Sequence, residues 1–292
     1  MEPQRPLPAR SRGIITCCDA NYFAGLIAMY DSVQRSCPCP VVAFDLGLTE
    51  TQHAFAKSRE RLHIMQLPDD PRIERVRHAT HNDAPLGKPG KRIWPLWICP
   101  ILIDSAPFDD VYWLDCDLLV LRDFDLMLAA LDDGPVFTPE NKAPEVTANN
   151  PRLYDYATIE RAFDPKIPLI NAGVSGWRKS RDRDVLDAYL LLVDRAASDD
   201  RVRALISWHD QGCLIWAIQK TGQEHRVRPT NSWNCSVEHT AILNDMPEAG
   251  SDELAVIRQR VPQIAVVHWN GHRSPWGGRS LETLPPNEPC PS

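Results

Sequence analysis

The order of strand-like and helix-like segments in the first 121 residues is the feature that most limits the possible folds. The first apolar run, at 13–18, is followed by helical apolar spacing over 20–36 and by a second run at 41–47. Thr49 and Gln52 then form a capping box, which predicts a helix reaching about Arg61. Two more apolar runs follow, LHIMQL at 62–67 and VYWLDCDLLVL at 111–121. Strands that alternate with helices in this way form a parallel sheet with helices on its faces.

The second half of the chain mixes strands and helices less regularly. We expect a glycine-interrupted strand and a late strand, and helices on both sides of them. The expected strands are 167–177 and 263–269, and the expected helices are 124–133, 183–197 and 210–222, with one more inside 92–105. Residues 68–90 are rich in proline and are expected to be irregular.

One α/β domain is the organisation that this pattern favours. We expect a disordered segment at 1–12, a domain at 13–280 and a flexible tail at 281–292. Within the domain, a first half at 13–125 is followed by a second half at 126–280, where the pattern is less regular.

Composition excludes several classes of protein. The net charge of −7 argues against a nucleic-acid partner. No apolar run reaches the roughly 20 residues that cross a bilayer, and the N-terminus lacks the apolar core of a secretory signal. Nine cysteines without a CxxC pair indicate reduced thiols rather than a zinc site, so a cytoplasmic location is expected. The sequence leaves the oligomeric state open.

Two acids, Asp115 and Asp117, interrupt the most apolar run of the chain. Residues i and i+2 of a strand point to the same side, and ligands of α/β sheets bind at the carboxyl ends of strands. Two converging carboxylates repel each other unless a cation lies between them, and oxygen ligands suit Mg²⁺, Mn²⁺ or Ca²⁺. Because D-x-D also occurs at 123–125 and 182–184, this spacing alone does not establish a metal site.

Four other segments accompany YWLDCDLLV in a fixed order. They are TCCDANYFAGLIAMYDSV at 16–33, LINAGVSGWR at 169–178, SWHDQGCLIWAI at 207–218 and VVHWNGHRSPW at 266–276. In this combination the chain resembles glycosyltransferase family 8, which includes glycogenin and the galactosyl- and glucosyltransferases of lipopolysaccharide assembly. The resemblance covers roughly 13–276. It implies a GT-A fold, which is a Rossmann-like mixed sheet flanked by helices in a single domain. In that fold, 13–125 would be the nucleotide-binding half and 126–280 the half that meets the donor sugar and the acceptor.

The resemblance also implies an activity, which is retaining transfer of a hexose from a UDP-sugar to a hydroxyl of a saccharide or glycoconjugate. It assigns Asp115, Asp117 and His268 to a metal, Mn²⁺ or Mg²⁺, and Asp210 and Gln211 to catalysis beneath the anomeric carbon. The implied donor and nucleotide contacts are Asp19, Asn21, Tyr22, Cys116, Asn171, Ala172, Gly173 and Gly271. Asp19 and Asp210 could instead simply cap the helices that follow them.

The sequence departs from the family at two positions. Ser274 stands where the family has a lysine that binds the diphosphate, and the preceding Arg273 could supply the charge. The helix before D-x-D lacks its usual basic residue, and Arg92 is the expected substitute. Segments 68–91 and 139–166 are both candidates for a lid over the donor.

A cluster of tryptophans offers two interpretations. Aromatic faces stack on sugars, so these side chains could contact a saccharide acceptor, but they could equally be core residues. The residues concerned are Trp177, Trp208, Trp233, Trp269 and Trp276.

Three other functions are weighed against the glycosyltransferase. A sugar nucleotidyltransferase would carry a basic, glycine-rich loop after its first strand, whereas CCDANYFAG has one late glycine and no Lys or Arg. A non-catalytic nucleotide-sugar-binding protein would explain Ser274, but the presence of Asp210 and Gln211 argues against it. A lectin-like module needs no D-x-D.

For the transfer itself, same-face attack is favoured over double displacement, because Gln211 is a poor nucleophile and Asp210 is the only implied carboxylate near the anomeric carbon.

Overall fold

A mixed sheet forms the centre of the molecule. The structure is a computed structural model that describes residues 11–81, 93–140, 169–206, 208–228, 231–236 and 265–269. In this part of the chain the main sheet has six strands in the order β3-β2-β1-β4-β7-β6. They are β1 (Arg12–Cys18), β2 (Val41–Asp45), β3 (Leu62–Met65), β4 (Asp110–Leu114), β6 (Val136–Pro139) and β7 (Ile170–Arg178). The first four are parallel, as the sequence predicts, and β7 runs antiparallel to both β4 and β6.

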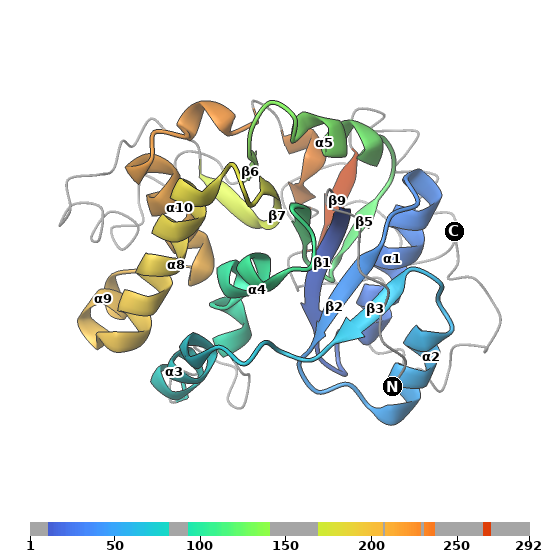
Figure 1. Ribbon diagram of the computed structural model, residues 1–292, viewed down its shortest axis with the longest axis horizontal. Coiled ribbons are helices and arrows are strands. Elements are labelled where there is room, and N and C mark those ends of the chain that lie inside the picture. Colours follow the sequence, from blue (N-terminus) through green and yellow to red (C-terminus); the bar gives the residue numbers. More distant parts are fainter. Residues whose placement is uncertain are drawn as a thin grey trace.

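Helices cover both faces of this sheet, as Figure 1 shows. One face packs against α1 (Phe23–Ser36), α2 (Glu50–Lys57) and α5 (Phe124–Ala130). The other packs against α3 (Pro71–Ala79), α4 (Cys99–Ser105), α8 (Arg183–Ser198) and α10 (Asp210–Lys220), with α9 (Asp200–Leu205) following α8. Neighbouring strand residues such as Ile14 and Ile15 belong to opposite cores, which explains the continuous apolar runs.

A second, smaller sheet completes one side of the site. Its strands are β5 (Leu118–Val120), β9 (Val266–His268) and β8 (Cys235–Ser236), in the order β5-β9-β8. Short 3₁₀ helices lie at η1 (Trp94–Leu96), η2 (Glu224–Arg226) and η3 (Asn231–Trp233).

Local signals explain several element boundaries. The predicted capping box is confirmed, because Thr49 Oγ1 accepts from Gln52 N at 3.2 Å while Gln52 Oε1 accepts from Thr49 N at 2.9 Å. The helix ending near Gly222 is also confirmed, since this glycine has φ +70°, a left-handed conformation that favours glycine after a helix.

The structure corrects the predicted elements at two places. The run 111–121 is not one strand, because β4 ends at Leu114 and β5 begins at Leu118 in the other sheet. Residues 71–79 are not irregular but form α3, which begins after Asp70; the carboxylate of Asp70 accepts from Arg72 N at 2.8 Å. Neither β6 nor α9 was predicted, and β1 begins one residue earlier than expected.

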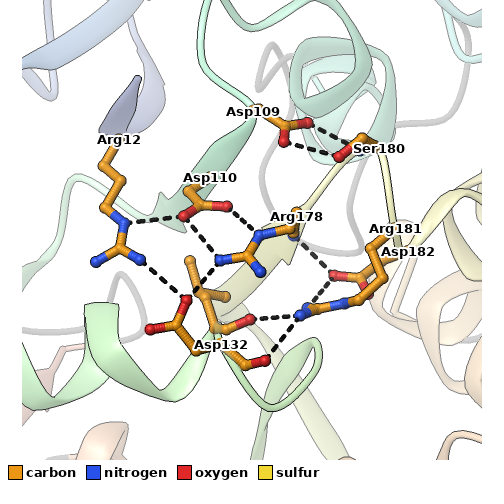
Figure 2. A network of polar contacts seen from close by, with 9 residues as sticks. Arg12, Asp109, Asp110, Asp132, Arg178, Ser180, Arg181 and Asp182 are labelled. Carbon is orange, nitrogen blue, oxygen red and sulfur yellow. Dashed lines mark hydrogen bonds and ion pairs between the residues drawn. The ribbon is translucent and has the colours of Figure 1, made fainter. Parts of the chain in front are cut away.

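An ion-pair network ties together the end of the sheet opposite the carboxyl ends of β1 and β4 (Figure 2). The side chain of Asp110 is 2% exposed and pairs with Arg12 at 2.9 Å and Arg178 at 2.6 Å. Asp132 accepts from both guanidinium groups, at 3.1 and 2.7 Å. The network therefore joins the starts of β1 and β4 to the end of β7.

Two expectations drawn from composition, reduced cysteines and no membrane-spanning segment, can be compared with the described part of the chain. All eight cysteines in the described part of the chain are free thiols. No helix there has the length and apolar character that crossing a membrane requires.

Candidate functional site

A cavity of about 740 Å³ lies at the carboxyl ends of β1, β2 and β4. Because parallel strands end at the same edge, the loops after them meet there. Every predicted site residue that the structure describes lines this cavity: Asp19, Asn21, Tyr22, Asp115, Cys116, Asp117, Asn171, Ala172, Gly173, Asp210, Gln211 and His268. The predicted contacts Arg92, Gly271 and Arg273 lie outside the described residues.

Asp115, Asp117 and His268 form a group that could hold a metal ion. One ligand atom from each residue lies within 4.8 Å of the others. His268 Nε2 is 3.0 Å from Asp117 Oδ1 and 3.6 Å from Asp115 Oδ2. The acids meet the imidazole because the chain turns between β4 and β5, and because Leu118 of β5 pairs with His268 of β9. The convergence therefore comes from this turn and not, as predicted, from alternation along one strand.

Two members of this group have raised pKa values. Burial raises the pKa of the Asp115 carboxyl, His268 lowers it and Asp117 raises it, with a net rise. Burial lowers the pKa of His268, but Asp117 overrides this effect and the pKa rises. A cation between the two acids would offset their mutual repulsion, and carboxylates with imidazole are ligands that Mn²⁺ accepts. The residues present therefore fit a divalent cation.

Neighbouring groups fix the positions of the two acids. Trp113 Nε1 donates to Asp115 Oδ1 at 2.8 Å, and Asp115 N donates to Gly173 O at 2.9 Å. Trp269 N donates to the carbonyl oxygen of Asp117 at 2.8 Å. Trp113 was not predicted as a site residue, although its place two residues before Asp115 puts both side chains on the same side of the chain.

Asp19, Asn21 and Tyr22 line the cavity after β1. Asp19 Oδ1 accepts from the backbone N of Asn21 at 2.9 Å and of Tyr22 at 3.1 Å, so Asp19 does shape the turn before α1. Tyr22 is 36% exposed, and its partial burial raises the pKa of its hydroxyl. Cys116 Sγ lies 3.2 Å from both Thr16 Oγ1 and Cys17 O, which attaches the acidic turn to β1.

The predicted sugar-binding and catalytic residues come from β7 and from the start of α10. Gln211 Oε1 accepts from Ala172 N at 3.2 Å, which links the two elements. The hydroxyl of Tyr189 donates to Asp210 Oδ2 at 3.2 Å. Asp210 is the first residue of α10 rather than its N-cap, which is His209. Burial raises the pKa of Asp210 well above its usual value, and the charge of Asp115 adds to this.

The backbone before α10 is unusual. Trp208 and His209, both cavity residues, have φ values of 58° and 57°. Residues other than glycine rarely adopt this left-handed region of φ, because it strains the backbone. Strained backbone of this kind concentrates at functional sites.

Sequence reasoning missed the wall formed by η1. Trp94, Pro95 and Leu96 line the cavity, and Leu96 is 42% exposed. The Arg77 guanidinium of α3 lies over the Trp94 ring at 4.5 Å, so the unpredicted helix supports this wall. No pattern in the sequence before α4 shows that these three residues line a cavity rather than belong to an ordinary loop.

The predicted tryptophans divide between the cavity and the core. Trp208 lines the cavity, whereas Trp177 is fully buried between Phe137 and Tyr189. Trp276 lies outside the described residues.

Comparison with solved structures identifies the fold. An active-site glutamine-to-glutamate mutant of LgtC matches with a TM-score of 0.59 and 18% identity, over 92% of this chain and 91% of that one. The galactosyltransferase LgtC with donor and acceptor sugar analogs matches with a TM-score of 0.58 and 18% identity, over 92% and 90%. The chain has the GT-A glycosyltransferase fold. Mouse xyloside xylosyltransferase 1 matches this GT-A chain with a TM-score of 0.54 and 12% identity, over 90% and 99%.

Sequence comparison adds no relative to these GT-A structures. No protein-family model matches the sequence, and no curated protein matches it either. The expected GT-A fold is therefore confirmed by structure, through neighbours that include LgtC, a family 8 galactosyltransferase.

Proposed function

We propose that this chain is a metal-dependent, retaining glycosyltransferase of family 8 that transfers a hexose from a UDP-sugar to a hydroxyl of a saccharide or glycoconjugate. The observation that carries the proposal is the meeting of Asp115, Asp117 and His268 within 4.8 Å, inside a cavity at the carboxyl edge of a GT-A sheet. The solved complex of LgtC with donor and acceptor sugar analogs supports sugars as the partners.

The charge of the cavity supports metal dependence. Its described lining includes the carboxyl groups of Asp19, Asp115, Asp117 and Asp210, and no Lys or Arg. A diphosphate would be repelled by these acids unless a cation intervened. Asp115, Asp117 and His268 would hold Mn²⁺ or Mg²⁺, which supplies positive charge to the leaving diphosphate. Arg92, Arg273 and the Gly271 backbone are proposed to add contacts to the donor.

The nucleotide is proposed to bind beside β1. Asp19 Oδ1 already accepts two backbone N–H groups, whereas among the described residues Oδ2 accepts one hydrogen bond, from the Asn21 side-chain amide at 3.5 Å. Oδ2 is therefore suited to accept from the uracil N–H, and the half-exposed ring of Tyr22 is suited to stack on the base.

The donor sugar is proposed to lie between β7 and α10. Because Gln211 Oε1 accepts from Ala172, its Nε2 is left to donate to a sugar hydroxyl. Asp210, whose carboxyl is held by Tyr189, would stabilise positive charge at the anomeric carbon. We favour same-face attack, in which the acceptor hydroxyl enters beside the departing UDP and Asp210 orients the sugar.

Release of UDP tests the proposal. Native chain would be incubated with a panel of UDP-hexoses, with and without Mn²⁺ and saccharide acceptors. We expect release from at least one donor, dependent on metal and absent in Asp117→Ala. Tight binding of UDP and Mn²⁺ without release from any donor would contradict catalysis and favour the non-catalytic nucleotide-sugar-binding protein.

A further inference from the structure

Asn234 connects the metal-ligand group to the segment proposed to contact the donor sugar. It lies between η3 and β8 and is 2% exposed. Its Oδ1 is 3.0 Å from His268 Nδ1, and its Nδ2 donates to Asn171 Oδ1 at 2.9 Å. We propose that Asn234 is a positioning residue, which directs the His268 ring toward Asp115 and Asp117 and couples it to Asn171. This inference deepens the proposed function and rests on it for two identities, the divalent cation near His268 and the donor sugar near Asn171.

The direction of the hydrogen bonds follows from a backbone donor. Gly173 N can only donate, and it meets Asn171 Oδ1 at 2.8 Å. Asn171 Nδ2 in turn donates to the Glu140 carboxylate at 3.0 Å. Both contacts make Asn171 Oδ1 an acceptor, so Asn234 must present its nitrogen to it.

The second hydrogen of the Asn234 amide leads to the same orientation. Asn234 Nδ2 also donates to Thr138 Oγ1 at 2.9 Å, and the Thr138 hydroxyl donates to Val174 O at 2.9 Å. With both hydrogens of Nδ2 used, Asn234 Oδ1 is the atom that faces His268, and His268 Nδ1 must carry a hydrogen to donate to it.

The orientation of Asn234 decides which imidazole nitrogen can bind a cation. Because Nδ1 donates to Asn234, Nε2 is the nitrogen that faces Asp117 at 3.0 Å and Asp115 at 3.6 Å. A metal-binding histidine is generally oriented in this way, by a partner on its other nitrogen. Asn234 therefore acts on the cation through His268, without touching it.

The backbone keeps Asn234 at this position. The residues after it pair with β9 in parallel register, Cys235 with Val267 and Ser236 with His268. Because Asn234 is buried, bulk water could not readily replace a lost hydrogen bond to His268. A shift of Asn171 on sugar binding would thus be transmitted to His268.

Two substitutions of Asn234 in the full chain separate its contact with His268 from its contact with Asn171. Asn234→Ala removes both contacts, and it should weaken Mn²⁺ binding roughly 10- to 100-fold, the range for lost partners of metal ligands. Asn234→Asp keeps an oxygen for His268 but loses donation to Asn171. It should keep Mn²⁺ affinity within about threefold of native while weakening UDP-hexose relative to UDP.

Thr138→Val is the matched control, because it removes another partner of the same buried amide without touching His268. Calorimetric titration with Mn²⁺ alone, together with the melting temperature of each variant, gives a readout that does not depend on catalysis. We expect Thr138→Val to lower the melting temperature but to bind Mn²⁺ within about threefold of native.

Two outcomes would overturn the role of Asn234. One is native Mn²⁺ affinity in folded Asn234→Ala. The other is an equal loss of Mn²⁺ affinity in Asn234→Asp and Thr138→Val, which would indicate that the packing around the amide has loosened in general. This comparison also decides the question if Asn234→Ala does not fold. If native chain binds Mn²⁺ but no UDP, only the UDP-sugar assignment fails; if it binds no Mn²⁺, both proposals fail.

Discussion

Gly173 of β7 lies close against the metal-ligand group. A Cβ at this position would lie 2.4 Å from His268 Cε1 and 2.7 Å from Asp115 Oδ2. A third atom, Asn171 Oδ1, would lie 2.9 Å away. Contacts below 3.0 Å force something to move, and here the two nearest obstacles belong to the proposed ligands. This close approach explains the glycine of the N-A-G segment. The bulge that a strand glycine often marks is present as well, because the pairing of β6 with β7 shifts from Phe137–Ser175 to Thr138–Asn171 around Gly173.

Gly173→Ala should weaken Mn²⁺ binding by roughly tenfold or more, because the new methyl group displaces His268 or Asp115. Gly176→Ala is a suitable control, since it lies in the same strand and would crowd Tyr112 at 2.6 Å instead. Both variants should melt at lower temperature, but only the first should lose metal affinity in a calorimetric titration. Equal metal affinity in the two variants would contradict the assigned geometry.

Asp210→Asn tests the proposed role of this carboxylate. If Asp210 orients the sugar and stabilises charge, turnover should fall by roughly 100-fold while KM for the UDP-sugar changes little. Steady-state UDP release measures both constants. A covalent glycosyl-enzyme trapped at Asp210 in the native chain would instead support double displacement.

At the scale of elements, the sequence predicted the first half of the sheet well, because β1, β2 and β4 are buried on both faces and each gives a continuous apolar run. The sequence-based prediction failed where a single apolar run supplies two strands of different sheets. The apolar run around Asp115 and Asp117 supplies β4 and β5, and hydrophobicity does not reveal that the chain changes sheets between them. It also failed for α3, where Asp70 and Pro71 mark a helix start that was read as irregular chain.

The network around Asp110 holds three strand ends together, and Asp110→Asn should break it (Figure 2). Arg12 and Arg178 would then keep only the exposed Asp132 as a carboxylate partner in this network. Removing one partner of a buried ion pair typically costs about 3 kcal/mol or more. Asp187→Asn is the control, because the Asp187 side chain is 57% exposed in its pair with Arg183. It should cost about 0.5 kcal/mol or less in urea-induced unfolding.

Acidity should remove the contribution of Asp110. Burial raises the pKa of this carboxyl, but Arg178 and Arg12 lower it further, so the folded-state pKa lies below the usual value. The difference in stability between the native chain and Asp110→Asn should therefore be complete above about pH 4 and shrink as the pH falls below it. Urea titrations at several pH values measure this, and a difference that grew on acidification would contradict the assignment.

At the scale of the whole molecule, the carboxyl edge of the sheet brings together residues far apart in the sequence, such as Asp19 and His268. The ordered motifs predicted this meeting because each follows or begins a strand or helix at one edge. The supporting residues could not be predicted in the same way. Asn234 and Tyr189 are single polar residues in otherwise ordinary segments, and only the packing of distant elements brings them to His268 and Asp210.

Calorimetric titration of the full chain with UDP, with and without Mn²⁺, tests the central claim most directly. The account predicts that UDP binds with Mn²⁺, that removal of Mn²⁺ abolishes binding, and that Asp117→Ala does the same while remaining folded. Asp187→Asn, on the exposed face of α8, should bind as the native chain does. UDP binding that is equally tight without any divalent cation would contradict a metal-centred site, and no UDP binding under any metal condition would contradict the UDP-sugar assignment.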